Sequence, residues 1–192
     1  MIVVAIVGLL ATVALPQMVN FQARARQSEV KVNLRAWYEV ETLYFHEKNG
    51  YVESIIETGF SPTVGNRYAY LMSSSCTYQV RNTAAITTPE GANCITVDQN
   101  RFPTSALAYA PAAISATFTG AGGDPALPGV AGTCPSCNAL AIGTANLDNE
   151  LAGIDTWLIS TKAGTVASCG TSNETRLVPG VVFHVKNDVN CD

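Results

Sequence analysis

The residues of this sequence whose spacing most readily suggests chemistry are its cysteines. They are Cys76, Cys94, Cys134, Cys137, Cys169 and Cys191. The motif Cys134-Pro-Ser-Cys137 has the spacing of a redox dithiol. A thioredoxin-like site requires that motif after a strand and at the start of a helix, whereas here it follows glycine- and proline-rich sequence and precedes NALAIG. A structural disulfide is therefore the favoured interpretation, and a redox site is the alternative.

The six cysteines predict an oxidising compartment, because an even number accompanies an apolar N-terminus. Fifteen complete pairings are formally open. Proximity along the chain favours Cys76–Cys94, Cys134–Cys137 and Cys169–Cys191. Each closed loop would stabilise the fold by about 3 kcal/mol through the unfolded state. Buried free thiols are the alternative.

Carboxylates and amides gather in the segment NLDNELAGID, residues 146–155. Alternating oxygen ligands of this kind can bind Ca²⁺, which makes Asp148 and Asp155 weak calcium candidates. The segment lacks the spacing and the central glycine of an EF-hand. A hydrogen-bonded turn between two strands is therefore favoured over a metal site.

Nothing else in the sequence predicts catalysis or a cofactor. His46 and His184 are far apart and lie in no triad or metal motif, and no phosphate-binding, nucleophile-elbow or dinucleotide motif is present. The net charge is −4, so nucleic acid is not expected as a main ligand. We expect no catalytic residue, no cofactor and no metal.

The N-terminus is apolar, and its first fifteen residues carry no charge. As a helix they would span about 22 Å, less than the bilayer core of about 30 Å. A cleaved secretory signal would need a positive segment before the apolar run. A transmembrane anchor would need roughly five more apolar residues. The third interpretation is a helix that sits first in a membrane and later inside a protein filament.

The following residues predict that this helix continues to about residue 48. No glycine or proline occurs between Pro16 and Gly50, and Asn49-Gly50 is a typical helix stop. Apolar residues recur at helical spacing and predict one face that packs on a folded head. They are Val30, Leu34, Trp37, Val40 and Tyr44.

The stretch MIVVAIVGLLATVALPQMVNFQARARQSEVKVNLRAWYEVETLYF resembles the N-terminal helix of type IV pilins. The segments NRYAY (66–70) and NLDNELAGIDTW (146–157), with the cysteine placement, are similar to the larger disulfide-containing major pilins of gliding myxobacteria. Mature subunits of that family typically begin with an N-methylated phenylalanine, in the run F-T-L-I-E-L. The resemblance predicts that these six residues, with the family's glutamate, precede Met1.

The resemblance implies an α+β pilin fold with three regions. Residues 1–24 would be the exposed hydrophobic segment, 25–50 the amphipathic half of the helix packed on the head, and 51–192 a β-rich globular head. The polymerisation core would comprise Ile2, Val3, Val4, Ile6, Val7, Leu9, Leu10, Val13 and Leu15. Gly8 and Pro16 weaken a regular helix, so residues 8–16 are predicted to be stretched in the filament; a simple proline kink is the alternative.

Strands are expected in the head at 66–72, 76–82, 113–120, 138–145, 155–161 and 180–187. Consecutive hairpins would form one antiparallel sheet whose apolar face lies on the helical stripe. The segments 83–112 and 120–136 are expected to be surface loops.

The function implied by the resemblance is structural. The chain would be the major subunit of an extracellular pilus, used for surface attachment and for twitching or gliding motility by extension and retraction. Its partners would be copies of itself, the inner membrane before assembly, and the assembly machinery with its ATPases; a surface polysaccharide is a further candidate. The alternatives are a pseudopilin of type II secretion and a membrane-anchored periplasmic binding or redox domain.

Overall fold

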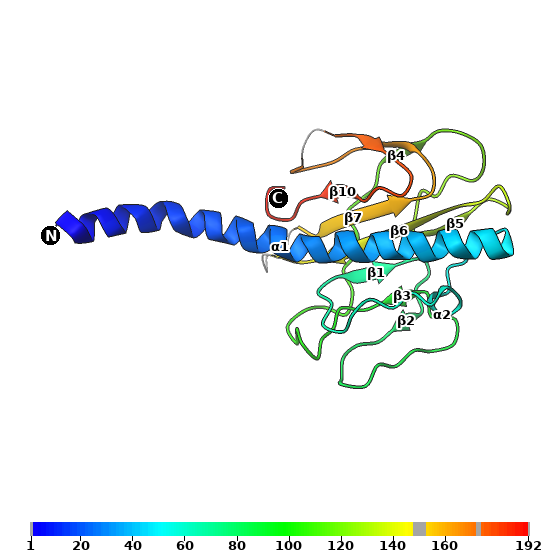
Figure 1. The fold of residues 1–192 in the computed structure, drawn as a ribbon, viewed down its shortest axis with the longest axis horizontal. Helices are drawn as coiled ribbons and strands as arrows, with labels where there is room; N and C mark the ends of the chain where they lie inside the picture. Colours follow the sequence, from blue (N-terminus) through cyan, green and yellow to red (C-terminus); the bar gives the residue numbers. More distant parts are fainter. Residues whose placement is uncertain (1, 148–152, 172–173, 192) are drawn as a thin grey trace.

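One long helix organises the molecule. The computed structural model describes residues 2–147, 153–171 and 174–191, with the backbone alone for residues 2, 4–17, 19 and 20. Helix α1 (Ile2–Lys48) is continuous, and its backbone stays helical through Gly8 and Pro16. About half of α1 projects from the head as a gently bowed rod, and the other half lies along the head (Figure 1). The stretched segment expected in a filament is therefore not a feature of the single chain, and stays a prediction for the assembled state.

The end of α1 confirms the stop expected at Asn49-Gly50. Asn49 adopts a left-handed conformation, with φ of 59°, and its N–H donates to the carbonyl of Phe45 at 2.8 Å. This bond satisfies one carbonyl of the last turn. A short helix, α2 (Ile55–Thr58), follows, and its N-terminus is capped by the Ser54 hydroxyl.

The described part of the head contains two sheets. The larger has seven strands in the order β10-β7-β6-β1-β3-β2, with β5 also pairing with β6. Its strands are β1 (Ala69–Leu71), β2 (Tyr78–Gln79), β3 (Cys94–Ile95), β5 (Gly129–Ala131), β6 (Asn138–Ala145), β7 (Asp155–Ser160) and β10 (Phe183–Lys186). The smaller has three strands, β4 (Ala116–Phe118), β8 (Gly164–Val166) and β9 (Arg176–Leu177), in the order β4-β8-β9.

Both faces of the larger sheet are covered. On one face, alternate residues of β6 and β7, such as Ala141 and Ile159, join the cluster formed by the helix. On the other face, Leu140, Ile142 and Leu158 pack with apolar residues of β8 and β9. The head therefore has a helix layer, a central sheet and a partial outer sheet.

Small residues on β6 allow α1 to lie close to the sheet. Ala139, Ala141 and Ala145 face the helix cluster. Gly143 lies on the same face, where a Cβ would be only 2.3 Å from Cγ2 of Val30. Because Val30 is fully buried, it has no space to move away. The helix axis can approach the strand only where the strand lacks side-chain bulk.

The buried stripe of α1 differs in part from the expected one. Val30, Leu34 and Trp37 are buried as predicted, but Val40 and Tyr44 are only half-buried. The stripe continues instead to Glu41, which is 1% exposed. Upstream it extends to Gln27 and Ala23. The buried residues recur at spacings of four and three, so they form one nearly straight line along the helix surface.

All six cysteines form disulfides: Cys76–Cys94, Cys134–Cys137 and Cys169–Cys191. These are the pairs that proximity along the chain favours. The motif Cys134-Pro-Ser-Cys137 lies in the turn before strand β6 and does not open a helix. Its setting is therefore that of a structural staple, because a thioredoxin-like dithiol requires a helix N-terminus.

The predicted strand arrangement is wrong in three respects. The sheet is not a row of consecutive hairpins, since β1 lies between β6 and β3. Strands β2 and β3 pair in parallel. The segments expected to be loops contribute β3 and β5. Strands of two or three residues, which include β8 and β9, are too short to show an alternating pattern.

Substitution of Gly143 by Ala should destabilise the head. The new methyl group would contact Val30 at a distance that forces the helix or the strand to move, at a cost of about 1–3 kcal/mol. Denaturant unfolding of the full chain in detergent measures the change. In a Val30→Ala background the same substitution should cost clearly less, because the clashing methyl is gone. Equal costs in the two backgrounds would contradict the close contact.

Candidate functional site

A buried carboxylate connects the helix to the sheet where α1 leaves the head. Asp155 is fully buried at the start of β7. Its Oδ2 accepts hydrogen bonds from the Tyr68 hydroxyl at 2.5 Å and from Trp157 Nε1 at 2.6 Å. Its Oδ1 accepts from Gln27 Nε2 of α1 at 3.1 Å and lies 2.8 Å from His184 Nε2 of β10. One side chain thus joins four segments of the chain.

The hydrogen bonds of Asp155 fit the interpretation of this segment as a hydrogen-bonded turn. A carboxylate offers about four lone-pair positions, and those of Asp155 are taken by protein donors. Burial, and next the charge of Asp155, raise the pKa of Tyr68 well above its usual value, so the hydroxyl remains a donor. Asp155 therefore acts as a structural anchor between α1 and the sheet. Asp148 lies outside the described residues, and within them no cluster of metal ligands is found.

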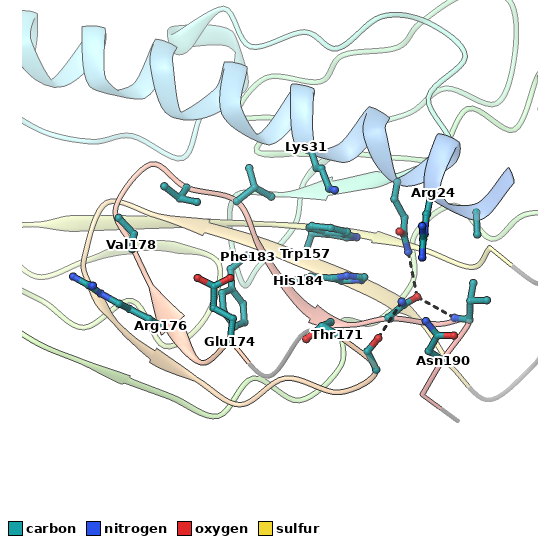
Figure 2. Close-up of a pocket in the computed structure, with 17 residues that line it drawn as sticks. Arg24, Lys31, Trp157, Thr171, Glu174, Arg176, Val178, Phe183, His184 and Asn190 are labelled. Carbon is teal, nitrogen blue, oxygen red and sulfur yellow. Dashed lines mark hydrogen bonds between the residues drawn. The ribbon is translucent and has the colours of Figure 1, made fainter. Parts of the chain in front are cut away.

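Next to Asp155, three side chains form a stack. The rings of Trp157 and His184 lie parallel, with centroids 3.7 Å apart and an interplanar angle of 9°. Lys31 Nζ lies 4.8 Å from the centroid of the Trp157 ring. Figure 2 shows Lys31 above Trp157 and His184 below it. The stack forms the floor of a cavity between α1 and the C-terminal part of the head.

The cavity has a volume of about 590 Å³ and a cationic lining. Three of its lining residues, Arg24, Lys31 and Arg176, carry a positive charge, and Glu174 carries a negative one. Arg24 and Arg176 come from opposite walls, α1 and β9 (Figure 2). Among the described residues, no carboxylate forms an ion pair with any of the three cations. The charged side chains of the lining therefore carry a net positive charge.

A second carboxylate anchors α1 on its other flank. Glu29 accepts hydrogen bonds from the backbone N–H groups of Arg67 and Tyr68 and from the Tyr70 hydroxyl. Burial raises the pKa of Glu29 above its usual value, and the two backbone hydrogen bonds partly oppose that effect. Glu29 and Gln27 thus fix the rotation of the helix against the head from both sides.

Glu41 is a buried acid that sequence reasoning missed. From the sequence, a glutamate in this helix is expected to face solvent, yet Glu41 is buried. Burial raises its pKa to about 8, the charge of Glu53 adds to the rise, and the backbone N–H of Val52 opposes it from 3.4 Å. At neutral pH its carboxyl group is therefore mostly protonated.

The exposed part of α1 contains the predicted polymerisation residues. Of these, the structure describes the side chain of Val3, which is 71% exposed. Met18 and Phe21 are also exposed, and Ala23 is the first buried side chain that the structure describes on α1. In the part of the chain that the structure describes, no helix has the length and apolar character needed to cross a membrane.

Replacing Asp155 by Asn should strongly destabilise the protein. The amide would keep the shape but turn an NH₂ group toward donors, which leaves buried polar groups unpaired at a cost of about 2–4 kcal/mol. Urea unfolding followed by tryptophan fluorescence measures this. Glu39→Gln is the matched control, because Glu39 forms an exposed pair with Arg35 and should change stability by less than about 0.5 kcal/mol. Similar losses for both variants would refute the anchor.

Glu41 should make stability depend on pH. Its folded-state pKa of about 8 lies above the ordinary value of 4.5, so its contribution is complete below pH 4.5 and is lost as the pH rises to 8. The total loss is on the order of 5 kcal/mol, at about 1.4 kcal/mol per pH unit. Glu41→Gln should flatten this part of the profile and be the more stable protein at pH 8. A parallel pH profile for both proteins would be inconsistent with a buried, protonated Glu41.

Two comparisons with known proteins agree with this architecture. The family described as Type IV pilin PilA matches residues 21–154. The chain is also 40% identical, over 201 aligned positions, to the protein named Type IV major pilin protein PilA from Myxococcus xanthus (strain DK1622). That alignment covers 100% of this chain and 90% of the relative. The N-terminal helix, the mostly antiparallel sheets and the three disulfides match the predicted α+β pilin fold. This chain belongs to the type IV pilin family.

Proposed function

We propose that this chain is the major structural subunit of a type IV pilus, an extracellular filament built from many copies of it. The observation that carries the proposal is the projecting half of α1. It has an apolar sequence, and it stands clear of the part of the head that the structure describes (Figure 1). The 40% identity to a major pilin supports the same conclusion.

The physical driving force is the burial of this apolar rod. Each large apolar side chain removed from water contributes roughly 1.5–3 kcal/mol. Copies of α1 bundled along a common axis provide that burial, and a head-to-tail contact that does not close extends without limit. The heads then form the outer surface of the filament. The region boundaries proposed above, 1–24, 25–50 and 51–192, follow this division between rod, packed helix and head.

The outward face of the packed half of α1 extends the same surface. Phe21, Val32 and Leu43 are 66%, 68% and 64% exposed. They lie on the side of the helix opposite to the buried stripe, because each is two residues from a buried member of it. The pairs are Phe21 with Ala23, Val32 with Leu34, and Leu43 with Glu41. The proposed polymerisation core runs from Ile2 to Leu15. Contacts between the helices of neighbouring copies would therefore extend beyond this core.

The remaining parts of the function rest on membership of the family. Before assembly the apolar rod would be held in the inner membrane, and the assembly machinery with its ATPases would extract and return it. The assembled filament would lie outside the cell and serve attachment, twitching and gliding. Gly8 and Pro16 would permit the helix to stretch between them when it leaves the lipid for the bundle. A surface polysaccharide would contact the heads.

A pseudopilin of type II secretion would share the helix but would not give long extracellular filaments. A membrane-anchored periplasmic domain would be monomeric in detergent. For a redox domain, Cys134 and Cys137 would react readily with thiol reagents, but they form a disulfide in a turn. Electron microscopy of material sheared from cells separates a pilus from both alternatives, and filaments with bundled helices at the axis are the result expected here.

Phe21→Gln should reduce filament assembly strongly, because it places an amide in the helix bundle. The matched control is Leu127→Gln, the same kind of change in the head at nearly equal exposure, 64% against 66%. We expect the yield of sheared filaments to fall at least tenfold for Phe21→Gln, the equivalent of about 1.4 kcal/mol per contact, and to stay unchanged for Leu127→Gln.

The membrane pool of each variant is measured by immunoblot, since a subunit that is degraded cannot assemble. Normal filaments from Phe21→Gln, or an equal defect in Leu127→Gln, would count against assembly through α1.

A further inference from the structure

The segment from the packed half of α1 to α2 carries opposite charge at its two ends. At the end where α1 emerges, residues 24–35 include four cations and one anion. They are Arg24, Arg26, Lys31 and Arg35, with Glu29. From residue 39 to 57, where α1 ends and α2 begins, four acids accompany one lysine, apart from the buried and mostly protonated Glu41. They are Glu39, Glu47, Glu53 and Glu57, with Lys48. The segment from α1 to α2 is therefore polarised along the helix axis.

The basic end is concave. Arg24, Lys31 and Arg176 line the cavity of about 590 Å³ between α1 and the C-terminal part of the head. All three side chains are exposed, and none is neutralised by an ion pair with a described carboxylate. With Glu174 included, the charged side chains of the lining carry a net positive charge, which would attract an incoming anionic group.

The acidic end is formed by the last turns of α1 and by α2. The tip of α1 reaches the far end of the head from the cavity, and α2 lies close to it (Figure 1). Glu47 and Glu57 are exposed there, and the Tyr44 hydroxyl of α1 donates to Glu57 Oε2 at 2.8 Å, which places α2 against the helix end. The C-terminus of a helix carries a partial negative charge, so acidic residues at this end add to an already negative field.

We propose that the cavity lined by Arg24, Lys31 and Arg176 receives the acidic tip around Glu47 and Glu57 of a second copy of this chain, as the head-to-head contact along the filament. The inference rests on the proposed function. Parallel subunits that lie side by side and are displaced along α1 by the length of one head, about 35 Å for the 23 residues from Arg24 to Glu47, bring the cavity of one copy level with the acidic tip of the other. The contact is head-to-tail and does not close on itself, which is the geometry of a filament.

A charge exchange tests this contact in cells that make the full chain as their sole major pilin. The basic variant is Arg24→Glu with Arg176→Glu, and the acidic variant is Glu47→Lys with Glu57→Lys. Each should lower the yield of sheared filaments about tenfold, because like charges then face each other. The protein that carries all four substitutions should recover to within about threefold of the unsubstituted yield, since the attraction is restored with the signs reversed.

The controls distinguish a variant that fails to fold from one that folds but loses the contact between heads. The protease resistance and membrane level of each variant report whether the head is intact. If a reversed variant is degraded, the neutral pair Arg24→Gln with Arg176→Gln replaces it and should give an intermediate yield. Thr117→Glu, on the exposed position of β4 in the outer sheet, should leave the yield unchanged.

Three results would overturn the proposal: normal yield from both charge-reversed variants, a loss from the basic variant alone, or no recovery in the exchanged protein despite a normal membrane level. The second result would mean that the cavity holds an anion from another source. Absence of filaments from the unsubstituted chain would instead refute the proposed function, so the two failures can be told apart.

Discussion

The contact between α1 and β6 is the constraint around which the head is built. A helix can lie this close to a strand only if the strand presents almost no side chain toward it, and β6 presents alanines and Gly143. The larger side chains of the interface then come from the helix and the flanking strands, as Val30 and Tyr70 do. This asymmetry leaves the helix in one position over the sheet, because any sideways shift would place its apolar residues against bulkier neighbours.

Buried polar groups define the rest of that position. Gln27 and Glu29 reach the head on opposite flanks of α1, and each hydrogen-bonds to a group that belongs to a particular segment: Asp155 at the start of β7, and the backbone at Tyr68. Apolar packing tolerates small rotations of a helix, whereas a buried carboxylate without its donors carries a desolvation cost. The direction in which the opposite face of α1 points is thereby determined by residues inside the head. For a subunit that assembles through that face, the buried contacts inside the head therefore determine which side of α1 is presented to neighbouring copies.

The sequence was sufficient for the features that rest on long, regular patterns. The uninterrupted stretch after Pro16 predicted one helix, and the apolar runs predicted β6 and β7 almost to the residue. The paired cysteines were also foreseen. What escaped prediction depends on distant segments meeting. Strand β3 has two residues and pairs with β1 and β2. Glu41 is buried by a neighbouring segment, and the sequence pattern of the helix alone does not predict that contact. Asp155 was noticed for its oxygens, but the donors that occupy them come from residues up to 128 positions away.

The end of the chain is fastened close to the point where α1 leaves the head. Cys191 is joined to Cys169. Strand β10, at the edge of the sheet, is linked to α1 through Asp155, whose Oδ1 contacts both His184 of β10 and Gln27 of α1. A force that draws the leading end of the rod away would act along the helix axis, parallel to its whole contact with the sheet. The interface would resist such a load in shear, all contacts sharing it at once, instead of peeling open one residue at a time. The Cys169–Cys191 disulfide would also help to keep β10 paired with β7 at the edge of the sheet.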